Sequence, residues 1–233
     1  MRVLELGNYV SVAYAGMILA EQGCEVTKWH TGKDPILGLR QGDELWEWIN
    51  AGKQMEEKNI LSLLDLHPLD YPDIVLDNFR PQTLEKWDVD PAQLADEMQC
   101  VWVSLRSEVG EVSFDMLAQC RSWLEYGPYL PFYIGDTAAG LWLAFKSLAV
   151  YGKRRIGHFC VGQSSCMQKL VEGELLLAPE REGRTPWDSE DYYFDEQARE
   201  GVVSFKGRMY REPVRNHAWK RQHLWHDHGR IRI

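Results

Sequence analysis

The chain has 233 residues, of which 45% are apolar and 26% charged, with a formal net charge of −9. These proportions are typical of a globular protein and exclude wholesale disorder, and no apolar run approaches the roughly 18 residues of a membrane span. An acid and a glycine come too early for a signal peptide, so we expect a cytoplasmic protein with no membrane partner.

The first thirty residues have the pattern of a βαβ unit. An apolar strand at 3–6 ends at Gly7, a helix follows at 13–22, and a second strand is expected at 24–29. Two strands joined by a helix in so short a segment indicate a parallel sheet. Only one glycine stands in the first turn, which disfavours the dinucleotide fingerprint and an NAD or FAD enzyme.

The same alternation continues to residue 105. The expected elements are a loop at 31–43, a short helix at 44–51, a buried strand at 73–76, a helical stretch at 83–99 that Asp90-Pro91 interrupts, and a strand at 101–105. The sequence therefore predicts an α/β fold, a Rossmann-like parallel sheet with flanking helices.

The second half starts with helical patterns and ends in a different composition. We expect a helix at 114–124, an extended aromatic segment at 129–135, the clearest helix at 137–150, and a strand with a helix within 160–177. From residue 178 prolines and glycines stand among charges. We therefore predict one domain over residues 1–177, followed by a linker and an extended, basic C-terminal arm over residues 178–233.

Charge is distributed unevenly between the arm and the rest. Residues 201–233 carry a net charge of +6, whereas residues 1–200 carry −15. An acidic body argues against general binding to a phosphate backbone. The arm alternates arginines with aromatics, which would suit single-stranded nucleic acid. Contact of the arm with the acidic body or with a partner subunit is the preferred interpretation, and nucleic acid is not expected as a partner.

The cysteines and histidines give no strong metal signal. The five cysteines form no CxxC pair, which favours a reducing compartment over a disulfide framework. His223, His226 and His228 have a spacing that can bind zinc, but no anchoring element is evident around them. We therefore expect no metal site.

Asp136 follows Gly135 and opens the clearest predicted helix. The simplest interpretation is a helix N-cap, whose side chain accepts a hydrogen bond from a following amide. The same position favours the ionised carboxylate, which can attack a reactive carbonyl. From the residues alone the cap is the favoured interpretation.

A series of short segments, in order along this βα pattern, resembles the class III CoA-transferases. This CaiB/BaiF-like family includes formyl-CoA transferase, carnitine CoA-transferase and α-methylacyl-CoA racemase. The resemblance covers roughly residues 1–171, and the strand ending in Asn78-Phe79-Arg80-Pro81 is its most specific part. The segments are 3–6, 19–28, 50–53, 73–81 and 134–136.

The resemblance implies a CoA-binding, Rossmann-like large domain, a small domain and a homodimer of interlocked chains. By resemblance Asp136 is the catalytic nucleophile: it would attack the thioester carbonyl, expel CoA and hold the acyl group as a mixed anhydride. The implied reaction moves CoA between an acyl-CoA and a small carboxylic acid. CoA and acyl-CoA are then substrates, and no permanently bound cofactor is expected.

The resemblance also implies a set of CoA contacts. Lys53 falls on a lysine suited to a phosphate, Asn78 and Phe79 would line the nucleotide pocket, and Lys86 is a basic residue of the next helix. Trp87 could stack on adenine. The alternative is that these residues have structural roles only. Asn78 is then a turn residue, Phe79 lies in the core, and both lysines lie on the solvated surface.

Departures from the family leave three hypotheses open. The family's members are nearly twice as long, so we expect the small domain and the glycine-rich loop over the aspartate to be missing, and His30 replaces the usual glutamate. The chain is then a compact active CoA-transferase, an inactive CoA-binding or scaffold relative, or one subunit of a hetero-complex whose partner completes the site.

Overall fold

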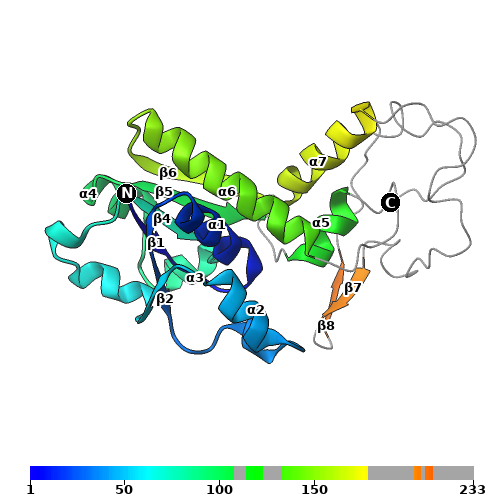
Figure 1. Ribbon diagram of the computed structural model, residues 1–233, viewed down its shortest axis with the longest axis horizontal. Coiled ribbons are helices and arrows are strands. Elements are labelled where there is room, and N and C mark those ends of the chain that lie inside the picture. Colours follow the sequence, from blue (N-terminus) through cyan, green and yellow to red (C-terminus); the bar gives the residue numbers. More distant parts are fainter. Residues whose placement is uncertain (108–113, 123–132, 178–201, 206–207, 212–233) are drawn as a thin grey trace, which may run out of the picture. The chain divides into compact units, whose positions relative to one another are not determined.

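The computed structural model describes residues 1–107, 114–122, 133–177, 202–205 and 208–211 (Figure 1). Its contacts divide the chain into two units. The first comprises residues 1–112 and 136–162, and the second comprises residues 113–135 and 163–233. The predicted boundary after residue 177 and the arm's role stay predictions.

The first unit is built on a six-stranded sheet in which every pairing is parallel. The strand order is β3-β2-β1-β4-β5-β6, and the predicted α/β parallel sheet is confirmed. The strands are β1 (Arg2–Glu5), β2 (Glu25–His30), β3 (Gln54–Glu57), β4 (Ile74–Asp77), β5 (Val101–Arg106) and β6 (Gly157–Gly162).

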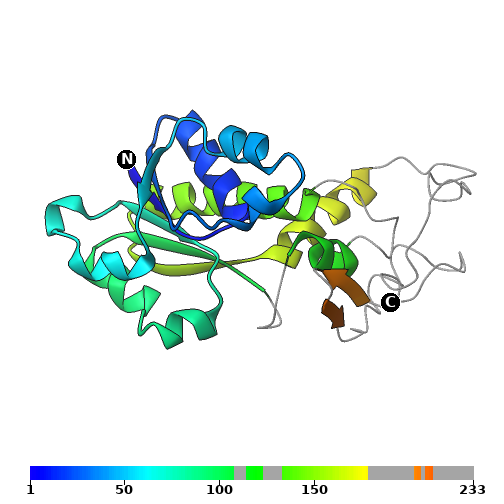
Figure 2. The same cartoon turned by 90° about the horizontal axis from the view of Figure 1, so that it is seen from below.

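Helices cover both faces of this sheet, as the turned view shows (Figure 2). One face carries α1 (Val10–Glu21), α2 (Gly42–Ile49) and α6 (Ile134–Gly152); the other carries α3 (Pro81–Lys86) and α4 (Pro91–Glu97). Asp90 caps α4 by accepting from the amides of Ala92 and Gln93, as the sequence predicted. Three short 3-10 helices complete the connections: η1 (Pro35–Gly38), η2 (Ile60–Asp65) and η3 (Pro68–Asp70).

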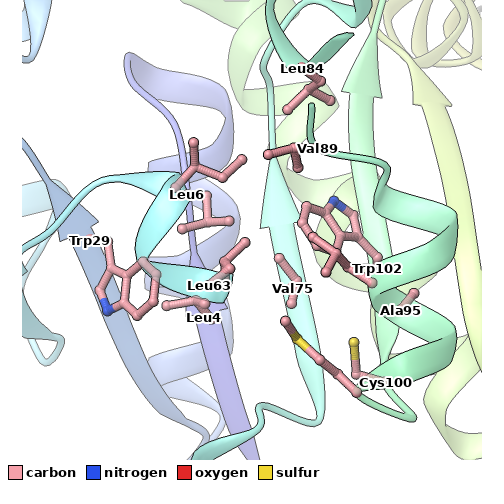
Figure 3. Packing of buried hydrophobic residues seen from close by; sticks show 13 residues of the cluster. Leu4, Leu6, Trp29, Leu63, Val75, Leu84, Val89, Ala95, Cys100 and Trp102 are labelled. Carbon is pink, nitrogen blue, oxygen red and sulfur yellow. The ribbon is translucent and has the colours of Figure 1, made fainter. Parts of the chain in front are cut away.

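The core under α3 and α4 is an apolar cluster centred on Trp102 (Figure 3). Trp102 is fully buried, and its side chain lies near Val75 of the neighbouring strand and Ala95 of α4. All four residues of β4 are buried, because helices cover both faces of a parallel sheet. This packing fixes the central strands whose carboxyl ends carry the candidate site.

One strand was missed, and one expectation about local structure was wrong. Strand β3 was not predicted, because its sequence, Gln-Met-Glu-Glu, is polar and lies at the sheet edge. Helix α6 begins at Ile134, so Asp136 stands in its first turn rather than at its cap, and Ile134 and Gly135 are not extended. The Gly135 amide donates instead to Asp115 Oδ1 at 2.7 Å, a contact that the local pattern does not reveal.

In the second unit, the described residues form two further helices and a short hairpin. Helix α5 (Asp115–Ser122) packs against α7 (Gln163–Leu177), and strands β7 (Val202–Phe205) and β8 (Arg208–Arg211) pair antiparallel. The expected helix at 114–124 and the helix within 160–177 are thus confirmed within the described residues. Residues 129–132 of the expected aromatic segment lie outside them.

Candidate functional site

The carboxyl ends of β1 and β4 mark the point where the strand order of the sheet reverses. The chain runs from β1 outward to β2 and β3, then returns to β4 on the other side of β1. In open α/β sheets this switch point is where ligands bind, in the crevice beyond the strand ends. Gly7 and Asn8 follow β1, and Asn78 and Phe79 follow β4, so both turns lie at this switch point.

Asn78 joins these two turns. Its Nδ2 donates to the Asn8 carbonyl oxygen at 2.6 Å, and its Oδ1 accepts from the Asn8 amide at 3.2 Å. Gly7 has φ +113° and lies so close that a side chain there would overlap Asn78 Oδ1. Asn78 therefore holds the backbone of the β1 turn in one conformation.

Asp77, which the sequence analysis assigned no role, anchors the turn that carries Asn78 and Phe79. Its Oδ1 accepts the Phe79 amide at 2.9 Å, an Asx-type turn. The carboxylate is fully buried, and three side chains of β5 donate to it: Trp102 Nε1 at 2.6 Å, Ser104 Oγ, and Arg106 Nη1 at 2.8 Å. Asp77 lies within the motif that ends in Asn78-Phe79-Arg80-Pro81, but the side chains that donate to it lie 25 or more residues away along the chain.

Phe79 precedes α3, and Lys86 and Trp87 lie at its carboxyl end. The Phe79 and Trp87 rings meet edge to face with centroids 5.4 Å apart, and Phe79 also packs against the core cluster. Lys86 and Trp87 are exposed. The structure thus brings Phe79 into contact with Trp87, the neighbour of Lys86, and leaves Lys86 and Trp87 accessible to a ligand.

Lys53, expected at a CoA phosphate, has a buried ammonium group. Its Nζ donates to Glu5 Oε2 at 2.7 Å, to the Ala13 carbonyl at 2.7 Å and to Asn50 Oδ1 at 3.0 Å. Burial lowers the pKa of Lys53, against the opposing charge of Glu5. Because an ammonium has three donors, a phosphate reaches Lys53 only by displacing one of these acceptors. Its role in CoA binding stays a prediction.

Glu5 is the centre of this buried ion network. Besides Lys53 it accepts from Lys28 Nζ at 2.6 Å, and Lys28 lies 3.9 Å from Asp34 Oδ2. Burial alone raises the pKa of Glu5, but the two lysines outweigh it and hold that pKa below its ordinary value. Asp34 in turn accepts the Tyr9 amide at 3.2 Å, at the start of α1. Two acids and two lysines thus balance in charge beneath the β1 turn.

Asp136, in the first turn of α6, is buried against the start of α1. Its Oδ1 accepts a hydrogen bond from Ser11 Oγ at 2.7 Å, and the two residues are 4% and 3% exposed. Ser11 lies in the first turn of α1, which begins directly after the turn that Asn78 holds. The structure therefore brings Asp136 and Asn78 to one end of the sheet. No sequence signal pointed to Ser11, because 125 residues separate it from Asp136.

A second polar cluster lies beside Asp77, on β6. His158 Nε2 is 2.8 Å from Ser104 Oγ, and Cys160 Sγ is 3.7 Å from the same nitrogen. Burial lowers the pKa of His158 and the nearby charge of Asp77 opposes this shift, while burial raises the pKa of the Cys160 thiol. The folded protein therefore favours the neutral imidazole and the protonated thiol.

His158 makes the stability of the fold depend on pH. Since its pKa is lower in the folded than in the unfolded chain, the unfolded chain binds more protons below about pH 6.5. We expect the free energy of unfolding to be fully retained above that pH and to fall as the pH drops below it. Urea unfolding at pH 7.5, 6.5 and 5.5 measures this, and His158→Gln should reduce the slope. An equal slope in both proteins would contradict the prediction.

The described part of the chain shows no further site of the classes considered from the sequence. No group of three or more His, Cys, Asp or Glu residues there could hold a metal ion. His223, His226 and His228 lie outside the described residues. Among the helices that the structure describes, none combines the length and apolar character needed to cross a membrane.

Known proteins with similar sequences are CoA-transferases. Residues 1–101 match the model of CoA-transferase family III. A CaiB/BaiF CoA-transferase family protein of Caenorhabditis elegans is 31% identical over 98 residues, which are 40% of this chain and 26% of that protein. A succinyl-CoA:mesaconate CoA-transferase of Haloarcula marismortui is 28% identical over 144 residues, 51% of this chain and 36% of that protein.

A third relative is named as one subunit of a larger enzyme. The succinyl-CoA–L-malate CoA-transferase alpha subunit of Chloroflexus aurantiacus is 29% identical over 101 residues, 37% of this chain and 23% of that protein. In each of these three comparisons the chain matches well under half of the relative's length.

Solved structures share the fold. A hypothetical protein of Mycobacterium tuberculosis superposes with a TM-score of 0.61 at 23% identity, covering 76% of this chain and 58% of that chain. A CaiB/BaiF family protein of Brucella suis gives 0.63 at 15% identity, covering 76% and 55%. Over residues 1–101, this chain is therefore similar to CoA-transferase family III.

Proposed function

We propose that this chain transfers CoA between an acyl-CoA thioester and a carboxylic acid, with Asp136 as the nucleophile. Similarity to the family implies CoA thioester substrates. The observation that carries the proposal is the buried Asp136 carboxylate, bonded to Ser11 at the start of α1, beside the turn that Asn78 holds. A carboxylate there can meet the thioester of a CoA whose nucleotide occupies the switch-point crevice.

The proposed reaction is defined by the bonds that form and break at Asp136. Asp136 attacks the thioester carbonyl, the C–S bond breaks, CoA leaves as its thiolate, and the acyl group stays on Asp136 as a mixed anhydride. The acceptor carboxylate, directly or after the CoA thiolate, attacks Cγ of Asp136. The bond from Cγ to the donor acid's oxygen breaks, the donor leaves as its carboxylate, and the acceptor is joined to Asp136 in a second anhydride. Attack of the thiolate on the acceptor's carbonyl forms the new thioester and restores the carboxylate. No redox step or bound cofactor enters this sequence.

For the nucleotide end of CoA we propose Asn78, Phe79, Lys86 and Trp87, with Lys53 below the crevice. Exposed Lys86 offers a positive charge to a phosphate, and exposed Trp87 offers a flat ring to adenine. The contacts of Lys53 with Glu5, Ala13 and Asn50 favour a positioning role under the β1 turn over direct phosphate contact.

Replacing Asn78 by alanine tests the pocket. Two hydrogen bonds that fix the Asn8 backbone are lost, so the β1 turn must be ordered when CoA binds, and the dissociation constant for CoA should rise about tenfold. Calorimetric titration of the full chain with free CoA measures it. Asn59→Ala is the matched control, since Asn59 caps η2 beyond edge strand β3. Equal affinity of both variants would remove Asn78 from the site.

A second candidate function is that of one subunit in a two-chain CoA-transferase. The chain matches only a fraction of its relatives' length, and one of them is itself named an alpha subunit. In this case the purified chain binds CoA but transfers it only together with a co-purifying protein. CoA binding without transfer under either condition would instead indicate an inactive relative.

A further inference from the structure

The exchange of acids on Asp136 needs a step that the first attack does not. After the first attack one carboxylate oxygen joins Asp136 to the donor acyl group. Attack of the CoA thiolate on the donor's carbonyl only regenerates the original thioester. The donor acid leaves only when a nucleophile, either the CoA thiolate or the acceptor carboxylate, attacks Cγ of Asp136 itself.

Attack at Cγ places negative charge on the carboxylate oxygen that is not joined to the acyl group. Such an oxyanion is stabilised most by a fixed donor 2.7 to 3.1 Å from the oxygen. Ser11 Oγ lies 2.7 Å from Asp136 Oδ1 and donates to it. When the acyl group is joined through Oδ2, Oδ1, which accepts from Ser11, is the oxygen that gains the charge.

The backbone fixes Ser11 against α6. Gly140 lies one turn after Asp136, on the same face of the helix. A β-carbon at Gly140 would come within 2.5 Å of the Ser11 carbonyl oxygen, so the glycine allows α1 and α6 to touch at this residue. Ser11 thus contacts α6 at two successive turns, through its hydroxyl and through its carbonyl.

We infer that Ser11 is a catalytic residue, the oxyanion donor for nucleophilic attack at Cγ of Asp136. This inference rests on the proposed function, since it needs an acyl group on Asp136. It assigns the hydroxyl to one half of the reaction only. The first attack, at the donor's carbonyl, develops its charge on the substrate's oxygen rather than on Oδ1.

Two isotope exchanges separate these halves of the reaction. Exchange of labelled CoA into succinyl-CoA needs attack at the donor's carbonyl alone, whereas exchange of labelled succinate into succinyl-CoA also needs attack at Cγ. Succinyl-CoA is the probe because it appears in the names of two relatives. In Ser11→Ala we expect succinate exchange to fall about 10²- to 10³-fold while CoA exchange is retained.

Ser147→Ala is the matched control, because Ser147 is also buried and its hydroxyl donates to the Leu143 carbonyl of α6. Both exchanges should keep their rates in that variant. Equal losses of both exchanges in Ser11→Ala, or none, at an unchanged melting temperature would overturn the assignment. If the unmodified chain shows neither exchange, alone or with a co-purifying protein, the proposed function itself fails, and the assignment with it.

Discussion

Asp136→Asn should lower CoA transfer by at least about 10⁴-fold while leaving CoA affinity unchanged. An amide cannot form the mixed anhydride, so the reaction loses its nucleophile. The asparagine keeps the size of the side chain and an oxygen that accepts from Ser11 Oγ, so the contact between α1 and α6 is preserved. Transfer from succinyl-CoA, together with a calorimetric titration with CoA, measures both quantities.

Asp43→Asn is the control for this variant. Asp43 also stands in the first turn of a helix, α2, but its side chain is exposed. It should change neither transfer nor affinity. Trapping with hydroxylamine adds a direct readout, because the unmodified protein should give a hydroxamate at Asp136 during turnover. An Asp136→Asn protein that unfolds would mean that the buried carboxylate is structural, and one that transfers CoA at the normal rate would exclude the nucleophile.

The central sheet could be predicted because its signals are local. The apolar strand at 73–76 and the strand at 101–105 lie between turn residues and helices of the right length, and helices on both faces of a parallel sheet require such buried strands. The polar edge strand β3 carries no such signal, since its pairing with β2 supplies its order. The start of α6 depends on Asp115, 20 residues earlier, and local pattern cannot reveal that contact.

The candidate site was predicted only in part, for the same reason. Asn78, Phe79 and Asp136 could be found from the resemblance, because short motifs carry them. The side chains that fix these three residues in place could not be found from the sequence. Asp77 depends on donors from β5, and Ser11 depends on a helix 125 residues away. Lys53 shows the opposite case, a residue whose motif points to a ligand but whose contacts are with its own chain.

Glu5→Gln should destabilise the fold by about 3 to 5 kcal/mol, the usual cost of removing one partner from a buried ion pair. The side chains of Glu5, Lys28 and Lys53 have no exposed surface. In the Glu5→Gln variant, Asp34 would be the one carboxylate of this network left to balance the two buried ammonium groups. A glutamine keeps the shape and accepts a hydrogen bond but carries no charge, so the loss reports on electrostatics rather than on packing. Urea unfolding at neutral pH, compared with Glu25→Gln at an exposed position of β2, measures it.

The double variant with Lys53→Met shows whether the loss comes from uncompensated charge. Once Glu5 is neutral, removing one buried lysine leaves Lys28 facing Asp34, so the double variant should be more stable than the sum of the two single losses predicts. Strict additivity, or a loss below about 1 kcal/mol in Glu5→Gln, would contradict the network. Because the network lies beneath the β1 turn, Glu5→Gln should also weaken CoA binding, even though Glu5 contacts no ligand in the proposed site.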